Sequence, residues 1–191
     1  YTPTHTLSLH DALPILDGAS YILATIHRPS NTDLPGNLKN ILSGLDAIAR
    51  ESKTPVVLPL HPRTDGMIRK LESQELLDRK ALSSNVRLIP PVSFLDMIKL
   101  ESGASLILTD SGGVQKEAWF MEKPVVVLRE ETEWTEIIQA GNGRLAGASE
   151  ERILEAARHF LENPPSLFPP LFGSGNAAGE ILKVLTTTRW E

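Results

Sequence analysis

Short apolar runs alternate with amphipathic segments along most of the chain, and this alternation limits the folds open to it. The runs span residues 21–26, 55–60, 86–89, 105–109 and 124–128, with a weaker candidate at 144–146. Most of the main runs are apolar along nearly their whole length rather than at every second residue, which indicates strands buried on both faces of a parallel sheet. Right-handed crossovers then predict a doubly wound, Rossmann-like α/β fold.

The segments between these runs carry apolar residues at helical spacing, which predicts amphipathic helices. N-caps are predicted at Asp33, Ser93 and Ser149. The helix that follows Asp33 begins with Pro35 in its first turn. A proline-rich stretch, residues 163–170, is predicted to be irregular and to precede a last helix over residues 177–185.

The first residues differ in pattern from the rest of the chain. Residues 1–16 contain two prolines and two histidines, have no helical or strand period, and lack the features of a signal peptide. We therefore predict that residues 1–20 are a non-native or disordered segment. Residues 21–185 are predicted to form one domain, and residues 186–191 a tail.

The composition excludes several classes of function. The formal net charge is −5, so no chain-wide positive field exists to hold nucleic acid or an anionic membrane. There is no cysteine, which excludes disulfides, thiolate zinc sites and thiol nucleophiles. No apolar run approaches the roughly 18 residues that a membrane-spanning helix needs. These features predict a cytoplasmic protein without nucleic-acid or membrane partners.

Polar residues follow four of the apolar runs, at the point where each run ends. They are His27 and Arg28, then His61 and Arg63, then residues 109–113, and finally residues 129–133. The C-terminal ends of parallel strands meet at one edge of a sheet, and such edges bind ligands. We therefore predict that these four groups form one site.

The sequence TDSGG, residues 109–113, leads from a predicted strand into a helix. Its glycines let the backbone approach a ligand closely, and the start of a helix favours phosphate. Glu117 follows in the first turns of that helix, where its carboxylate can accept both hydroxyls of a ribose. The alternatives are a turn needed only for tight packing and a solvated acid favoured by the helix dipole.

Histidines and arginines at the same edge suit a phosphate ligand. His27 and His61 can donate to a diphosphate and can carry a proton near neutral pH, although a structural role is the alternative for each. Arg28, Arg63 and Arg129 can pair with phosphate oxygens. No spacing of carboxylates and histidines predicts a metal site.

Together these residues resemble a known family, the non-hydrolysing UDP-N-acetylglucosamine 2-epimerases. The matching motifs are HRPSNTD (27–33), LHPR (60–63), LILTDSGGVQKEA (106–118), KPVVVLR (123–129) and TEWTE (132–136). The similarity runs from about residue 21 to about residue 185. It implies the C-terminal half of the two-domain glycosyltransferase-B (GT-B) architecture, with UDP or a UDP-amino sugar as ligand. The family inverts C2 of the sugar by eliminating and re-adding UDP, without metal or nicotinamide cofactor.

The resemblance also implies roles for single residues. Ser111, Gly112 and Gly113 would hold the diphosphate, and Glu117 the ribose. His27 is the implied catalytic residue, and the other implied contacts of the UDP-sugar are Arg28, His61, Arg63, Met97, Arg129, Thr132 and Glu133. Phe94 falls in a segment near the uracil. Many relatives have TERPE at residues 132–136, so Trp134 replaces an arginine and puts its contact in doubt.

The catalytic carboxylates of the family belong to its N-terminal domain. We therefore expect this chain to bind nucleotide but not to epimerise alone, and the resemblance implies a homodimer for the full-length enzyme. Two alternatives stay open, a fragment of a GT-B glycosyltransferase and a non-catalytic UDP-sugar-binding module. The sequence leaves the exact sugar undecided.

Overall fold

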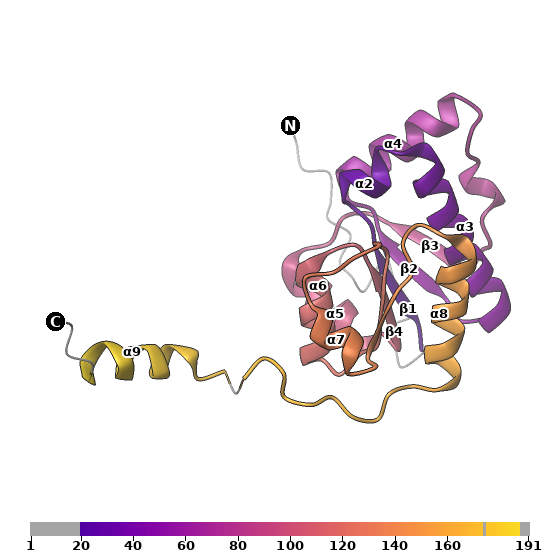
Figure 1. The fold of residues 1–191 in the computed structure, drawn as a ribbon. Helices are drawn as coiled ribbons and strands as arrows, with labels where there is room; N and C mark the ends of the chain where they lie inside the picture. Colours follow the sequence, from indigo (N-terminus) through magenta and orange to yellow (C-terminus); the bar gives the residue numbers. More distant parts are fainter. Residues whose placement is uncertain (1–19, 174, 188–191) are drawn as a thin grey trace.

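The computed structural model describes residues 20–173 and 175–187, and the strands in these residues form one parallel sheet (Figure 1). The strand order is β3-β2-β1-β4-β5-β6. The strands are β1 (Ile22–Thr25), β2 (Val56–Pro59), β3 (Val86–Ile89), β4 (Leu106–Thr109), β5 (Val125–Val127) and β6 (Gly143–Leu145). The predicted doubly wound α/β fold is confirmed, including the weaker strand candidate.

Helices cover both faces of this sheet. They are α2 (Pro29–Thr32), α3 (Pro35–Ser52), α4 (Pro62–Ser73), α5 (Phe94–Gly103), α6 (Gly112–Phe120), α7 (Thr135–Gln139), α8 (Glu150–Glu162) and α9 (Ala177–Thr187). A 3-10 turn, Arg79–Ala81, precedes β3. Helices α3 and α8 lie on one side of the sheet, and α5, α6 and α7 lie on the other (Figure 1).

The central strand β1 shows why the apolar runs are continuous. Ile22 and Ala24 belong to the core under α3 and α8, whereas Tyr21 and Leu23 belong to the core under α5 and α6. Successive side chains of a strand point to opposite faces, and here both faces are covered. Each position along β1 is therefore buried.

The predicted caps at Ser93 and Ser149 are confirmed, but the one at Asp33 is wrong. Ser93 accepts the backbone N–H of Asp96, and Ser149 accepts that of Arg152. Asp33 instead ends the short helix α2, and Leu34 stands at the N-cap position of α3 without a side-chain bond. The reason is that the Asp33 carboxylate is paired with a distant cation, as the site below shows.

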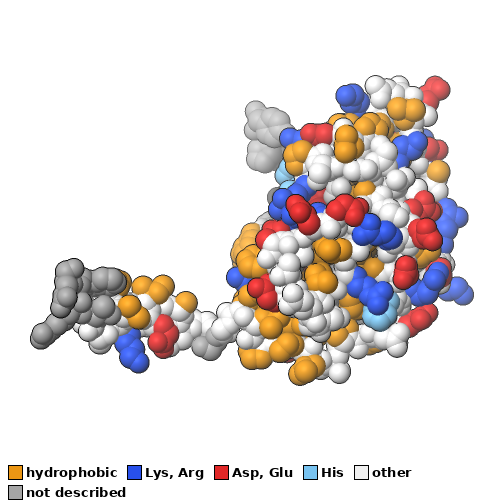
Figure 2. Space-filling view, viewed as in Figure 1, with side chains coloured by type: hydrophobic (Ala, Val, Ile, Leu, Met, Phe, Trp, Pro, Cys, Tyr) orange, Lys and Arg blue, Asp and Glu red, His pale blue; other side chains and the backbone are white. Residues whose placement is uncertain are grey.

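Helix α9 is present as predicted but projects away from the sheet (Figure 1). None of its residues is buried, and its apolar side chains face outward (Figure 2). Leu182, for example, is 63 % exposed. No helix among the described residues is both long and apolar enough to cross a membrane.

The predicted domain limits stay predictions. Residues 1–19 of the segment set apart at the N-terminus lie outside the described residues, and so do residues 188–191 of the predicted tail. Residues 186 and 187 belong to α9. The projection of α9 leaves residues 20–162 as the part that carries both cores, together with aromatic residues of the following stretch.

This arrangement predicts unequal costs for truncating two apolar side chains. Ile153 of α8 is fully buried against Gly44 of α3, so Ile153→Ala is expected to lower the free energy of unfolding by about 3 kcal/mol. Leu182→Ala on α9 is the matched control, with an expected change below about 0.5 kcal/mol. Urea unfolding measures both. An equal loss in the two variants would mean that α9 packs against the domain in solution.

Candidate functional site

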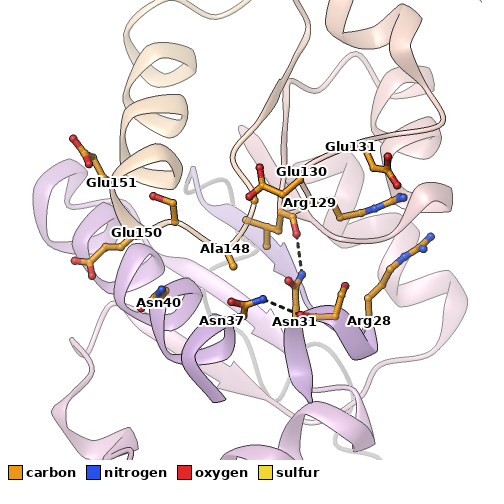
Figure 3. Close-up of a pocket in the computed structure, with 14 residues that line it drawn as sticks. Arg28, Asn31, Asn37, Asn40, Arg129, Glu130, Glu131, Ala148, Glu150 and Glu151 are labelled. Carbon is orange, nitrogen blue, oxygen red and sulfur yellow. Dashed lines mark hydrogen bonds between the residues drawn. The ribbon is translucent and has the colours of Figure 1, made fainter. Parts of the chain in front are cut away.

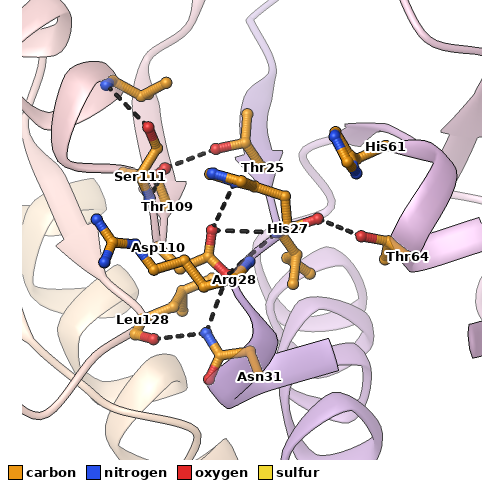
Figure 4. A network of polar contacts seen from close by, with 12 residues as sticks. Thr25, His27, Arg28, Asn31, His61, Thr64, Thr109, Asp110, Ser111 and Leu128 are labelled. Carbon is orange, nitrogen blue, oxygen red and sulfur yellow. Dashed lines mark hydrogen bonds and ion pairs between the residues drawn. The ribbon is translucent and has the colours of Figure 1, made fainter. Parts of the chain in front are cut away.

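A single buried carboxylate, that of Asp110, joins the ends of neighbouring strands. Asp110 follows β4 and is 0 % exposed. It accepts the backbone N–H groups of His27 at 3.1 Å and Arg28 at 2.9 Å, and the side-chain amide of Asn31 at 3.1 Å (Figure 4). The Nδ1 atom of His27 lies 3.0 Å from the same carboxylate. Residues 27–31, which follow β1, are thereby held against the end of β4.

The charge of Asp110 is stabilised by these contacts. Burial favours a higher pKa for Asp110, but the contacts from His27, from the Arg28 N–H and from Asn31 outweigh it and hold the pKa below its usual value. Asn31 also donates to the carbonyl oxygen of Leu128, at the end of β5, at 2.8 Å. The network therefore links the ends of β1, β4 and β5.

Sequence reasoning gave Asp110 and Asn31 no role, although both lie inside the motifs TDSGG and HRPSNTD. Asp110 directly follows a predicted strand, which is the same signal that singled out His27, and Asn31 lies a few residues beyond His27 in the same motif. A buried acid and an amide do not differ in sequence from exposed ones, so only the fold identifies them.

Hydroxyl groups hold the turn from β4 into α6. The hydroxyls of Thr25 and Thr109 are 2.6 Å apart, and Thr109 Oγ1 accepts the backbone N–H of Ser111 at 2.9 Å. Ser111 caps α6 by accepting the N–H of Val114 at 3.4 Å. The predicted glycine turn is thus the first turn of a capped helix.

An acidic side chain occupies the start of α6. The Glu133 carboxylate lies so close to Gly112 that a Cβ at that position would overlap it. Arg129 donates to Glu133 at 2.6 Å, and Arg28 lies 3.8 Å from it. A hydrogen bond from its own backbone N–H, together with Arg129 and Arg28, holds the pKa of Glu133 below its usual value. This position, between a helix start and two arginines, favours an anion.

Trp134 anchors the loop of residues 129–134 to α6. Its indole N–H donates to the carbonyl oxygen of Gly112 at 2.7 Å, and its ring meets Phe172 edge-on at 5.6 Å. The Lys116 ammonium lies 4.5 Å from the centre of the Trp134 ring. Thr132 donates to the side-chain oxygen of Gln115 on α6 at 2.5 Å. The residue that departs from the TERPE pattern therefore positions the loop through packing and one hydrogen bond.

A largely apolar cavity of about 250 Å³ opens beside the Asp110 network. Four predicted site residues line it together: His27, His61, Met97 and Ser111. The rings of the two histidines are 5.7 Å apart. Pro91 and Val92, which precede α5, complete an apolar wall on the side of Met97.

A larger, open cavity of about 830 Å³ lies on the other side of the network (Figure 3). Arg28, Asn31 and Arg129 line it, with Asn37 and Asn40 of α3 opposite. Its remaining lining combines four glutamates, at residues 130, 131, 150 and 151, with Ser30, Ser149 and the apolar or small residues Leu128, Gly147 and Ala148. Arg28 and Arg129, which contact Glu133, therefore also line this larger cavity.

Several predicted residues line neither cavity: Arg63, Phe94 and Glu117, and also Gly112, Gly113, Thr132 and Glu133 of the α6 start and its facing loop. Arg63 pairs with Asp33 at 2.8 Å, on an exposed surface. Phe94 is 71 % exposed. Glu117 is partly buried on α6 and lines neither cavity; its ionisable neighbour is Glu101 of α5. Within residues 20–187, leaving out 174, no group of three metal-binding side chains is found.

Comparison with known sequences finds one family. The family model described as UDP-N-acetylglucosamine 2-epimerase matches residues 4–186. A UDP-N-acetylglucosamine 2-epimerase homolog of Methanococcus maripaludis is 45 % identical over 166 residues, which cover 86 % of this chain and 44 % of the relative. The UDP-2,3-diacetamido-2,3-dideoxy-D-glucuronate 2-epimerase of Pseudomonas aeruginosa is 44 % identical over 165 residues, with the same coverage.

Comparison with solved structures agrees. The UDP-GlcNAc 2-epimerase of Methanocaldococcus jannaschii, crystallised in complex with UDP-GlcNAc and UDP, matches with a TM-score of 0.77 and 34 % identity. The match covers 88 % of this chain and 46 % of that one. The chain thus spans about half the length of the relatives it matches.

The Asp110 network predicts a strong effect of a nearly isosteric substitution. Asp110→Asn places an amide N–H group against donors, so we expect it to lower the free energy of unfolding by about 3 kcal/mol. Glu151→Gln, on an exposed acid, is the control, with a change below about 0.5 kcal/mol. Denaturant unfolding compares the two at neutral pH.

The pH dependence of stability gives a second readout of the same carboxylate. Because the pKa of Asp110 is lowered in the folded protein, its stabilisation is present above the unfolded value of 3.8 and is lost as pH falls through the folded value. Asp110→Asn should not show this loss of stability at acid pH, because its side chain cannot titrate. An acid transition that is the same in both proteins would contradict the assignment.

Proposed function

This chain belongs to the UDP-N-acetylglucosamine 2-epimerase family, and from that premise we propose that it forms the UDP-binding half of a two-domain GT-B epimerase. The proposed reaction converts UDP-N-acetylglucosamine to UDP-N-acetylmannosamine. The observation that carries the proposal is the convergence of a capped helix start, two arginines and two histidines around Asp110. The proposed enzyme is cytoplasmic and homodimeric, as the family resemblance implies.

We place the parts of the nucleotide by matching each to the side chains at the C-terminal edge of the sheet. The diphosphate takes the position of the Glu133 carboxylate at the start of α6, between Arg28 and Arg129. The uracil enters the apolar cavity beside Met97. The ribose hydroxyls donate hydrogen bonds to the carboxylate of Glu117, and the sugar extends toward the larger cavity.

The contribution of this half to the reaction is the departure of UDP. Elimination builds negative charge on the diphosphate, and the α6 N–H groups and both arginines stabilise that charge. Asp110 contacts Nδ1 of His27, so the ring presents Nε2 to the ligand, and as an imidazolium it can donate from Nε2 to the leaving oxygen. We place the carboxylates that move the C2 proton in the half of the relatives that this chain does not match.

Substrate choice is the open part of the proposal. Two relatives of nearly equal identity differ in name: one is a homolog of UDP-N-acetylglucosamine 2-epimerase, and the other is named for a diacetamido glucuronate. Both names describe UDP-2-acetamido sugars. We therefore propose this class, with UDP-N-acetylglucosamine as the member to test first.

Calorimetric titration with UDP tests the ribose contact. Glu117→Ala removes acceptors for the ribose hydroxyls, so we expect affinity to fall about tenfold or more. Glu162→Gln, at an exposed acid of α8 that lines neither cavity, should bind as the unmodified chain does. A folded chain that does not bind UDP, or a Glu117→Ala variant that binds as well, would contradict this placement.

The same titration tests whether the diphosphate replaces Glu133. Glu133→Gln removes the carboxylate that holds the two arginines, so UDP should bind about two- to fivefold more tightly. Raised salt should reduce this gain because the competing contacts are exposed. Weaker binding by the variant would mean that Glu133 contacts the ligand directly.

A further inference from the structure

A second acidic group is enclosed between α5 and α6, behind the proposed nucleotide site. Glu101, in the last turn of α5, is 0 % exposed, and neither of its carboxyl oxygens has a hydrogen-bond partner among the described residues. Glu117 of α6 is close enough to act on it by charge and by hydrogen bonding. Burying an ionised carboxylate without hydrogen-bond partners would greatly lower the free energy of unfolding.

Three features favour the neutral form of Glu101. Burial removes water from the carboxylate, the charge of Glu117 repels it, and the C-terminal end of α5 presents partial negative charge. Burial first, and Glu117 second, raise the pKa of Glu101 to about 8. At neutral pH Glu101 is therefore mainly the neutral carboxylic acid.

The other groups near this end of α5 do not offset the charge. Tyr21 lies beside it and donates its hydroxyl to the carbonyl oxygen of Leu100 at 2.6 Å. Burial raises the pKa of Tyr21 to about 12, so it stays neutral. Lys99 and Asp96 belong to α5 itself and pair with each other at 3.9 Å.

We propose that Glu101 is a positioning residue for the nucleotide ribose: as a carboxylic acid it donates a hydrogen bond to Glu117 and holds that side chain in one orientation. The inference rests on the proposed function, since it needs Glu117 to accept the ribose hydroxyls. A carboxylate has about four lone-pair positions, enough for one proton from Glu101 and for two hydroxyl donors. Without that proton, the two carboxylates repel each other and Glu117 turns away.

This arrangement couples recognition of the ribose to pH. Above about pH 8 Glu101 ionises, and the affinity for UDP falls. A nucleotide without ribose hydroxyls gains nothing from Glu117, so its affinity is independent of Glu101. A merely structural role for Glu101 would instead alter the binding of both nucleotides alike.

The test is calorimetric titration of the whole chain with UDP and with 2′,3′-dideoxy-UDP, on either side of the Glu101 pKa. Glu101→Met removes the donor at similar volume, and we expect about tenfold weaker binding of UDP with no change for the dideoxy nucleotide. Glu101→Gln keeps a donor and cannot ionise, so it should bind UDP equally well at both pH values. The unmodified chain should lose affinity for UDP at the higher pH.

The outcomes separate the inference from the proposed function. If the unmodified chain binds UDP no more tightly than the dideoxy nucleotide, the ribose contact of Glu117 fails and the inference fails with it. If the chain prefers UDP and Glu117→Ala abolishes the preference, but Glu101→Met retains it, only the role of Glu101 is overturned. Equal weakening of both nucleotides by Glu101→Met also overturns it.

Thermal unfolding supplies a readout that does not need ligand. Because the pKa of Glu101 is raised in the folded chain, stability falls as pH rises from the unfolded value of 4.5 through about 8. Glu101→Gln should remove that fall and show a higher unfolding temperature than the unmodified chain above about pH 8. The same pH dependence in both proteins would show that Glu101 is not the buried acid described here.

Discussion

The buried carboxylate of Asp110 is the constraint on which the whole edge of the sheet depends. A buried carboxylate needs hydrogen-bond donors. Here the donors are the backbone N–H groups of His27 and Arg28 and the side-chain amide of Asn31. These donors lie about eighty residues earlier in the sequence. Satisfying one charge therefore fixes the direction in which the chain leaves β1 and the orientation of the His27 ring.

The glycine turn of α6 is built against this anchored edge. Ser111 caps the helix, and Trp134 binds the opposite loop to the carbonyl of Gly112. With both sides held, the helix start faces two arginines, and Glu133 occupies the position between them. In the proposed site, a side chain of the protein thus stands where the ligand's anion would bind. A preformed arrangement of this kind spends little free energy on ordering when it binds.

The sequence predicted the secondary structure well where the signal is local. Continuous apolar runs became strands, and Ser93 and Ser149 became caps because a cap is made within four residues. The N-cap prediction for Asp33 was wrong. Its carboxylate pairs instead with Arg63, thirty positions away. The apolar stripe of α9 also predicted a helix correctly, but periodicity alone does not tell which surface a helix packs against.

The sequence by itself determined a parallel α/β sheet and which polar residues would gather at its edge, since strand ends share one side in this topology. Only the tertiary structure decided which atoms pair there. It turned Asp110 toward His27 and Glu133 toward the arginines, and it buried Glu101. The physical reason is that burial and the distance between charges set the state of an acid, and neither quantity exists until the segments are packed together.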